Sequence, residues 1–145
     1  MRYAVANDAE RVYVLSRQLA AAIGDSPPER EAVGERLAEL ISEPRARVLA
    51  AEDESGVKGV ATLWIKPDLA HGDTVVEVPT IVVDESSRGL GVGKLLMRAV
   101  RDLAAEQGAS LIELVATLDN AAARAFYKSL GFVETDHISL EYVGD

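Results

Sequence analysis

The sequence predicts a mixed α/β fold, in which a central sheet has antiparallel N-terminal strands and a parallel central pair, flanked by about four helices. The first observation is that two helical patterns open the chain, and the second is that β-like runs separated by polar turns follow them. The third is a strand, glycine turn, helix and strand in the second half, because such a crossover connection makes its two strands parallel. One substantial core fits this length, so we expect a single domain over residues 1–145.

Two amphipathic helices are predicted at the N-terminus. In residues 7–24, Asn7 lies three residues before Glu10 in a capping-box order, and apolar residues recur at helical spacing. Residues 26–42 begin with Ser26 and two prolines, which is typical of a helix start. The apolar positions are Val12, Leu15, Leu19 and Ile23 in the first helix and Val33, Leu37, Leu40 and Ile41 in the second.

The sheet is predicted from short apolar runs. Residues 46–52 and 57–65 flank the turn Asp-Glu-Ser-Gly as a hairpin, and residues 74–84 extend this antiparallel sheet after a loop at 66–73. A helix over residues 92–108 then leads to a strand at 111–117, which we expect to be parallel to the strand before the helix. The final predicted elements are a helix over 119–131 and strands at 132–135 and 138–143.

Composition excludes several function classes. The formal charge of −9 disfavours broad nucleic-acid binding, which depends on basic surface, and fits a cationic partner better. No run approaches the roughly 18 to 20 apolar residues of a membrane helix, so a soluble, cytoplasmic protein is expected. Zero cysteines and two isolated histidines predict no metal centre and no cysteine nucleophile.

The glycine-rich turn between a strand and a helix is typical of a phosphate site, because glycines allow close approach and the first helical N–H groups are unpaired. A P-loop is excluded, since Arg88 stands where its first glycine belongs and Leu95 where Ser or Thr belongs. A dinucleotide fingerprint is excluded because Lys94 replaces its third glycine. What remains is the pattern R-x-x-G-x-G, matched by Arg88, Gly91 and Gly93. A structural turn without ligand is the alternative.

This pattern resembles motif A of the GNAT superfamily of acetyl-CoA-dependent N-acetyltransferases, written Q/R-x-x-G-x-G/A. Downstream, the segment DNAAARAFYKSLGFVET resembles the family's motif B. Its matching residues are Asn120, Ala123, Phe126, Tyr127, Gly131 and Phe132. The two motifs at this separation are specific together, and the resemblance implies that acetyl-CoA is the cosubstrate, with its pyrophosphate at the glycine turn.

The resemblance also implies which residues contact the cosubstrate. Strand backbone before the turn would bind the acyl and pantetheine groups, a form of strand augmentation, and Asn120 could reach the cosubstrate or only cap its helix. Tyr127 would be the general acid for the departing thiolate, although its composition-based alternative is a packed helix aromatic. The full cosubstrate-binding set is Ile81, Val82, Val83, Arg88, Gly89, Leu90, Gly91, Val92, Gly93, Lys94, Asn120 and Tyr127.

A general base is needed because a protonated amine, with a pKa of about 10.4, has no lone pair for attack. Glu77 lies on the strand that leads to the turn, and even spacing predicts that Glu77, Pro79, Ile81 and Val83 share one face. The resemblance supports a catalytic glutamate there, often acting through water. An exposed surface charge is the alternative, and Glu113 is the rival carboxylate.

The resulting prediction is an N-acetyltransferase that works by direct attack, because no cysteine can carry a covalent acyl group. The expected acceptor is a small cationic amine, with a protein lysine or N-terminal amine as second choice. The alternatives are a non-catalytic acyl-CoA-binding or sensing module and a generic nucleotide-phosphate binder. Nucleic acid and membrane are not expected as partners, and the resemblance allows a homodimer.

Overall fold

The computed structural model describes residues 1–144. The chain divides into two compact units, one of residues 1–115 and one that begins at residue 116. None of the helices in residues 1–144 combines the length and the apolar character that crossing a bilayer requires.

One sheet organises the first unit, and its strands follow one another in chain order. The strands are β1 (Arg2–Tyr3), β2 (Ala46–Asp53), β3 (Gly56–Asp68), β4 (Asp73–Val83) and β5 (Leu111–Leu114). Neighbouring strands from β1 to β4 are antiparallel, whereas β4 and β5 are parallel. The predicted mixed sheet with a parallel pair is therefore confirmed. The predicted loop at 66–73 is shorter than expected, because Asp68 already pairs with Asp73.

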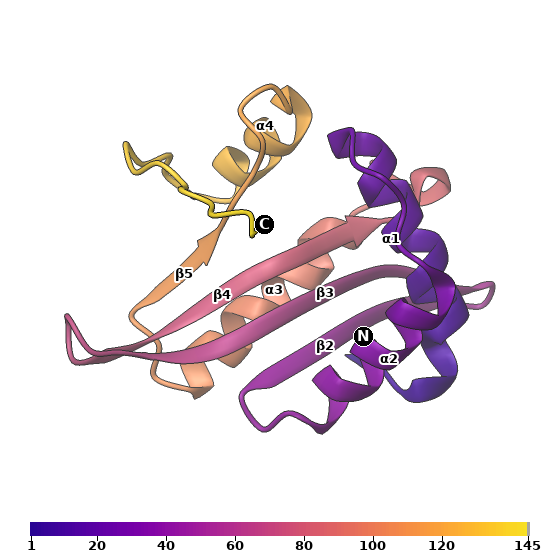
Figure 1. Cartoon of the computed structure of the whole chain (residues 1–145), viewed down its shortest axis with the longest axis horizontal. Coiled ribbons are helices and arrows are strands. Elements are labelled where there is room, and N and C mark those ends of the chain that lie inside the picture. The colour runs from indigo at the N-terminus through magenta and orange to yellow at the C-terminus, as the bar shows by residue number, and fades with distance from the viewer. Residues whose placement is uncertain (145) are drawn as a thin grey trace. The chain divides into compact units, whose positions relative to one another are not determined.

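Helices cover both faces of this sheet (Figure 1). Helices α1 (Ala9–Ile23) and α2 (Arg30–Ser42) lie on one face, and α3 (Val92–Glu106) lies on the other. The predicted Asn7 cap is wrong, because α1 begins at Ala9 after a 3-10 turn, η1 (Ala6–Asp8). The Asp8 carboxylate instead accepts the backbone N–H of Val5 at 2.8 Å and both terminal nitrogens of Arg2 at 2.8 and 2.9 Å.

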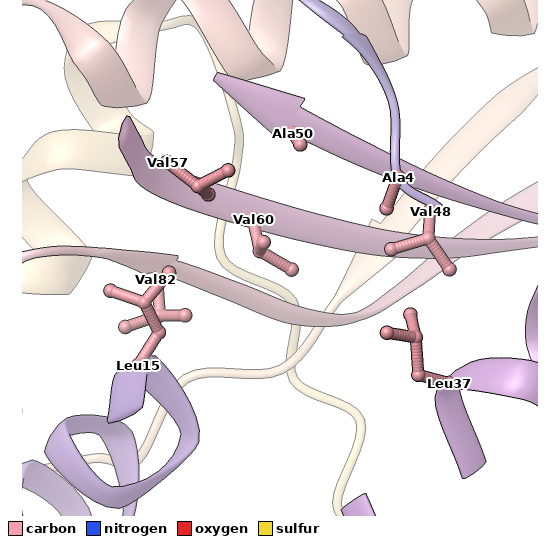
Figure 2. Packing of buried hydrophobic residues seen from close by; sticks show 8 residues of the cluster. All are labelled: Ala4, Leu15, Leu37, Val48, Ala50, Val57, Val60 and Val82. Carbon is pink, nitrogen blue, oxygen red and sulfur yellow. The ribbon is translucent and has the colours of Figure 1, made fainter. Parts of the chain in front are cut away.

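The core between the sheet and α1 and α2 is built from few, small apolar side chains. Figure 2 shows Leu15 of α1 pointing toward Val82, and Leu37 of α2 lying near Val48, with Val60 between the two groups. All five side chains are almost entirely removed from solvent.

The other core lies between the sheet and α3, where the buried residues of the helix are Leu96, Met97, Val100, Leu103 and Ala104. Gly59 of β3 permits this packing. A Cβ atom at Gly59 would lie 2.8 Å from Val92 Cγ1 and 2.9 Å from Leu96 Cδ1. With any other residue type at position 59, the helix that follows the glycine turn could not approach the sheet this closely.

A bulge in β4 changes which side chains share a face. Thr80 pairs with Thr62 and Glu77 pairs with Trp64, so two β4 residues, 78 and 79, oppose one residue of β3. Pro79 suits this position because a bulge leaves a residue outside the hydrogen-bond ladder, and proline has no N–H. The prediction that Glu77 shares a face with residues 81 and 83 is therefore wrong. Glu77 lies with Thr80 on the face that α1 and α2 cover.

The second unit contains α4 (Ala121–Ser129), which ends in a Schellman motif. Gly131 has a left-handed φ of 93°, its N–H donates to Lys128 O at 3.0 Å, and the N–H of Phe132 donates to Tyr127 O at 3.0 Å. The Tyr127 and Phe132 rings lie 5.8 Å apart, which is the apolar contact that accompanies this motif. The Gly-Phe pair of the second motif thus has a local structural role.

The strands predicted at 132–135 and 138–143 are absent from the described residues 132–144. The apolar side chains of this segment are exposed, namely Val133, Ile138, Leu140, Tyr142 and Val143. Their alternation indicated strands, but a strand also needs a neighbour that accepts and donates its backbone hydrogen bonds. The only regular element of the second unit within residues 116–144 is α4, which offers no such edge.

Candidate functional site

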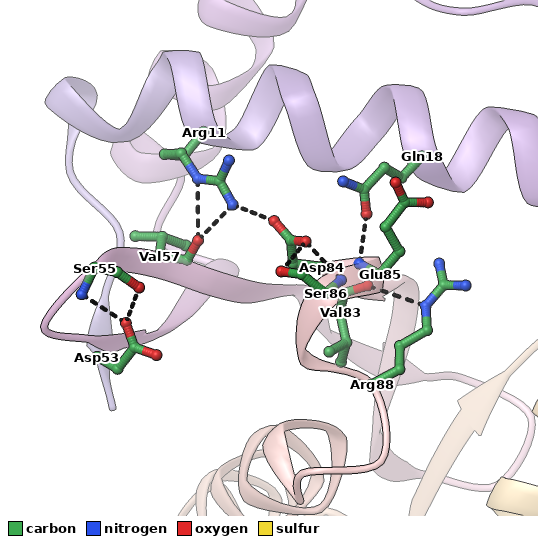
Figure 3. Close-up of polar contacts among 10 residues, drawn as sticks. All are labelled: Arg11, Gln18, Asp53, Ser55, Val57, Val83, Asp84, Glu85, Ser86 and Arg88. Carbon is green, nitrogen blue, oxygen red and sulfur yellow. Dashed lines mark hydrogen bonds and ion pairs between the residues drawn. The ribbon is translucent and has the colours of Figure 1, made fainter.

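Asp84 fixes the backbone between β4 and the glycine turn (Figure 3). It is buried, and its Oδ1 accepts the Ser86 N–H at 3.0 Å and the Ser86 hydroxyl at 2.8 Å. Arg11 of α1 donates to Asp84 Oδ2 at 2.5 Å and to Val57 O at 2.9 Å. The Ser86 N–H, with Arg11 and the Ser86 hydroxyl, holds the pKa of the Asp84 carboxyl well below its usual range. One carboxylate thus joins the turn to α1, and Arg11 extends the link to Val57 of β3.

Two further contacts hold the short 3-10 turn η2 (Glu85–Ser87) that follows. The backbone N–H of Glu85 donates to Gln18 Oε1 of α1 at 2.9 Å, and Arg88 Nε donates to Val83 O at 3.4 Å. Sequence reasoning missed Arg11, Gln18 and Asp84. The spacing of Asp84 and Ser86 is a recognisable Asx-turn signal, whereas Arg11 and Gln18 lie 73 and 67 residues from their partners and leave no local pattern.

The glycine turn ends in an open helix N-terminus. Gly89 and Gly91 have left-handed φ angles of 79° and 88°, and Gly91 is the N-cap of α3 without a side-chain cap. The N–H of Leu95 donates to Gly91 O at 3.0 Å and is the first intrahelical donor, so the N–H groups of residues 92–94 have no intrahelical acceptor. These three donors lie at the positive end of the helix dipole, an arrangement that binds phosphate.

β5 does not pair with the part of β4 that adjoins this turn. The parallel strand covers only Val75–Val78 of β4. The Asp84 N–H donates to Lys58 O of β3 at 2.7 Å, so strand alternation directs the N–H groups of Val83 and Ile81 away from β3. Val82, the third backbone position of the predicted set, has its N–H directed toward β3. The open edge offers two donors to a chain-like ligand.

Glu77 lies beside two charged neighbours on the face covered by α1 and α2. Its Oε2 accepts Lys66 Nζ at 2.9 Å, and it stands opposite Glu113 of β5 in the parallel register. The side chain of Glu77 is 39% exposed, so water and small solutes reach the carboxylate. The hydrogen bond to Glu77, followed by the nearby charges of Glu77 and Glu113, raises the pKa of Lys66. The base candidate and its rival thus form one acidic pair with a shared lysine.

In the second unit, Asn120 is the N-cap of α4, where its Oδ1 accepts the Ala123 N–H at 3.1 Å. Tyr127 is half-buried between Phe126 and Phe132, with ring centroids 5.4 and 5.8 Å away. Burial raises the pKa of the Tyr127 phenol, so the group keeps its proton at neutral pH and can donate it. The capping alternative for Asn120 is confirmed as a contact.

The predicted site residues therefore divide between the units. Glu77, the backbone of residues 81–83 and the turn of residues 88–94 belong to the first, and Asn120 and Tyr127 belong to the second. Among residues 1–144, no group of three or more His, Cys, Asp and Glu side chains is placed to hold a metal ion.

Residues 7–132 match the family model described as the acetyltransferase (GNAT) family. The chain belongs to the GNAT family of acetyltransferases. This confirms the resemblance inferred from the glycine turn and the α4 segment, and it identifies the predicted class, an acyl-CoA-dependent N-acyltransferase, as the class of the family.

Two curated relatives illustrate the range of the family. The mycothiol acetyltransferase of Kocuria rhizophila is 32% identical over 102 residues, which are 69% of this chain and 33% of that enzyme, so the chain spans about a third of its length. The N-alpha-acetyltransferase RimI of Mycobacterium tuberculosis is 32% identical over 128 residues, 86% of this chain and 72% of that enzyme. Among solved structures, a transcriptional regulator from Bacillus halodurans C-125 superposes with a TM-score of 0.87 at 20% identity, covering 99% and 97% of the two chains.

Proposed function

We propose that residues 1–145 form one N-acetyltransferase domain that transfers the acetyl group of acetyl-CoA to a primary amine by direct attack. The observation that carries the proposal is the open N-terminus of α3 after a glycine turn, in a chain of the GNAT family. Its three N–H donors and the positive end of the helix suit a pyrophosphate. The exposed Arg88 adds positive charge beside the same turn.

The unpaired edge of β4 supplies the second part of the fit. The N–H groups of Ile81 and Val83 would donate to the pantetheine arm and to the acyl oxygen, adding the ligand to the sheet as a further strand. The anchored Asp84 keeps this edge and the turn in fixed register, because it binds α1 and η2 at once. Fixed donors stabilise developing negative charge more effectively than mobile ones.

Two side chains would move the protons of the reaction. Glu77, through a water molecule, would accept the proton that the amine loses before its nitrogen attacks the acetyl carbon. Tyr127 would give its phenolic proton to the thiolate that departs when the carbon–sulfur bond breaks, and its raised pKa keeps that proton available. The attached nitrogen loses a second proton as the intermediate collapses, and that proton restores the Tyr127 phenol through solvent. The products are an amide, a free thiol and the one proton that Glu77 passes to solvent.

The first test is thiol release from acetyl-CoA, followed with a chromogenic thiol reagent across a panel of amines, with calorimetric binding of acetyl-CoA in parallel. Amine-dependent release at a rate that saturates with amine supports the proposal. Tight binding without release for any amine would favour a non-catalytic acyl-CoA-binding or sensing module. Absence of binding would overturn the assignment of the glycine turn.

The role of Glu77 is tested against its neighbour Glu113. The two carboxylates stand opposite each other on β4 and β5, so Glu77→Gln and Glu113→Gln remove the same charge at adjacent positions. We expect Glu77→Gln to lower kcat by about 100-fold at neutral pH. Glu113→Gln should leave kcat nearly unchanged. Equal effects of the two substitutions would show that only the local negative charge matters.

The acceptor proposed here is a small cationic amine, with a protein lysine or N-terminal amine as the second choice. The formal charge of −9 favours a cation. A homodimer remains a prediction of the family resemblance, which sedimentation of the purified protein tests directly.

A further inference from the structure

A pocket of about 250 Å³ lies between the sheet and the two N-terminal helices. It is lined by α1, α2 and the adjoining face of β2, β3 and β4. Its apolar lining includes Ala32, Leu37, Val48, Val60 and Val82. In Figure 2 the labelled residues Leu37 and Val48 lie on one side of Val60, and Val82 lies on the other.

Three hydroxyl side chains, Ser16, Thr62 and Thr80, lie in the largely apolar lining of this pocket, and the Ser16 hydroxyl donates to Val12 O at 2.7 Å. Thr62 and Thr80 are directly paired across β3 and β4, and both are half-buried. Neither hydroxyl forms a hydrogen bond with another group of residues 1–144. Half-buried hydroxyls that lack a protein partner bind water or a ligand, so the pocket can hold an apolar group and one polar group beside it.

The proposed base lies on the same face of the sheet as the pocket, one residue pair further along. The next pair along this face after Thr62 and Thr80 is Trp64 and Glu77, because the β4 bulge brings Glu77 onto the same face. Two residues of strand span about 7 Å. A ligand whose apolar group lies in the pocket can therefore place its amine beside the Glu77 carboxylate when a short linker joins the apolar group to the amine.

The positive charge of Arg36 at the pocket rim does not favour an acidic ligand. Arg36 is exposed, and its guanidinium already lies 3.3 Å from Glu35 and 3.3 Å from Glu39. The charge that remains for a ligand is that of Glu77 and Glu113, which share Lys66. The site therefore combines an apolar pocket with net negative charge at one end.

We infer that the acceptor is a primary amine with a single apolar substituent, an arylalkylamine or a branched alkylamine, whose substituent fills this pocket. The inference rests on the proposed function and narrows its acceptor class. A cavity of about 150 Å³ accommodates benzene, so the larger volume here admits an aromatic ring with its linker. A polyamine or an aminoglycoside would instead put polar groups against Leu37, Val48, Val60 and Val82, in a lining whose polar side chains are limited to Ser16, Arg36, Thr62 and Thr80.

The experiment compares 2-phenylethylamine and 3-methylbutylamine with ethylamine and spermidine as acceptors in the thiol-release assay. We expect kcat/KM for the first two to exceed that for ethylamine by about 100-fold, because methylene-sized groups in an apolar pocket each contribute a factor of about 10 or more. Ala32→Phe fills the pocket from its exposed rim on α2. It should lower kcat/KM for 2-phenylethylamine toward the value for ethylamine, and calorimetric binding of acetyl-CoA checks that the variant is folded.

Ala38→Phe is the matched control, since Ala38 is an exposed residue of the same helix outside the pocket. It should retain the wild-type preference. A preference for spermidine, or equal behaviour of the two alanine variants toward 2-phenylethylamine, would overturn the inference while the proposed function stands. Absence of thiol release with every amine would instead defeat the proposed function. Calorimetric binding of 2-phenylethylamine, weakened by Ala32→Phe but not by Ala38→Phe, then still tests the pocket alone.

Discussion

Replacing Asp84 with asparagine should destabilise the protein in a pH-dependent manner. The substitution keeps an oxygen that can accept the Ser86 N–H, but it removes the charge that binds Arg11. The Asp84 side chain is only 10% exposed, whereas that of Arg11 is 35% exposed, so solvent screens the pair only partly. A charge-assisted hydrogen bond of this kind contributes about 2 kcal/mol to the free energy of unfolding. A chain of 145 residues unfolds with an entropy of about 0.3 kcal/mol/K, so we expect Tm to fall by about 7 °C.

The sign of the pH dependence follows from the lowered pKa of Asp84. The folded pKa lies below the unfolded value of about 3.9, so the carboxylate stabilises the fold fully above that value and loses this contribution as pH falls through the folded pKa. The stability gap between wild type and Asp84→Asn should therefore be constant from pH 7 to about pH 5. By pH 3 it should shrink by about 1 kcal/mol.

Urea unfolding followed by circular dichroism at pH 7 and pH 3 measures this gap. Asp53→Asn is the matched control, because Asp53 Oδ1 also accepts the N–H and the hydroxyl of the serine two residues on, at 2.8 and 2.7 Å, but is bound by no arginine in residues 1–144 (Figure 3). We expect a smaller effect at Asp53. A gap that is absent at pH 7, or that is equally large at pH 3, would refute the assigned role of the Arg11 ion pair.

Three further substitutions test other parts of the site. Tyr127→Phe should lower kcat by about 100- to 1000-fold with unchanged acetyl-CoA affinity by calorimetry, since the ring packing is kept and only the proton is lost. Unchanged turnover would exclude the phenol as the acid. Gly91→Ala should weaken acetyl-CoA binding, and its cost in folding should be only about 1 kcal/mol of backbone strain, because nothing lies within 4 Å of the added Cβ. Normal affinity in the folded variant would contradict the phosphate site. Gly59→Ala should cost about 1–3 kcal/mol by forcing α3 off the sheet, whereas Gly34→Ala, in open space on α2, should be neutral or stabilising in the same thermal melts.

Local patterns predicted the elements whose stability depends on neighbouring residues in the chain. The helices, the hairpin at residues 53–56 and the parallel pairing of β4 with β5 follow from periodicity, turn residues and the handedness of crossover connections. The glycine turn was predictable for the same reason, because its φ angles and its unpaired N–H groups arise within a few residues.

Features that depend on a distant partner were not predictable. Arg11 binds the start of the turn from another helix, and nothing in its own sequence neighbourhood indicates this contact. The alternation of apolar and polar residues at 138–143 indicated which side chains would share a face, but not which strand would pair with them. That segment forms no strand in the described residues. The pocket beneath α2 depends on how two helices and three strands meet, which the apolar periodicity of each element does not contain.

The bulge at residues 78–79 decides what β4 can do. With strict alternation, Glu77 would lie on the same face as Ile81 and Val83, against the buried side chains of α3, where an unpaired carboxylate is costly. The extra residue moves Glu77 to the opposite face, next to Thr80 and the pocket. One strand therefore offers backbone donors along its open edge and a carboxylate on its α1 and α2 face. Pro79, which has no N–H to pair in the ladder, lies at the bulge between these two parts of the strand.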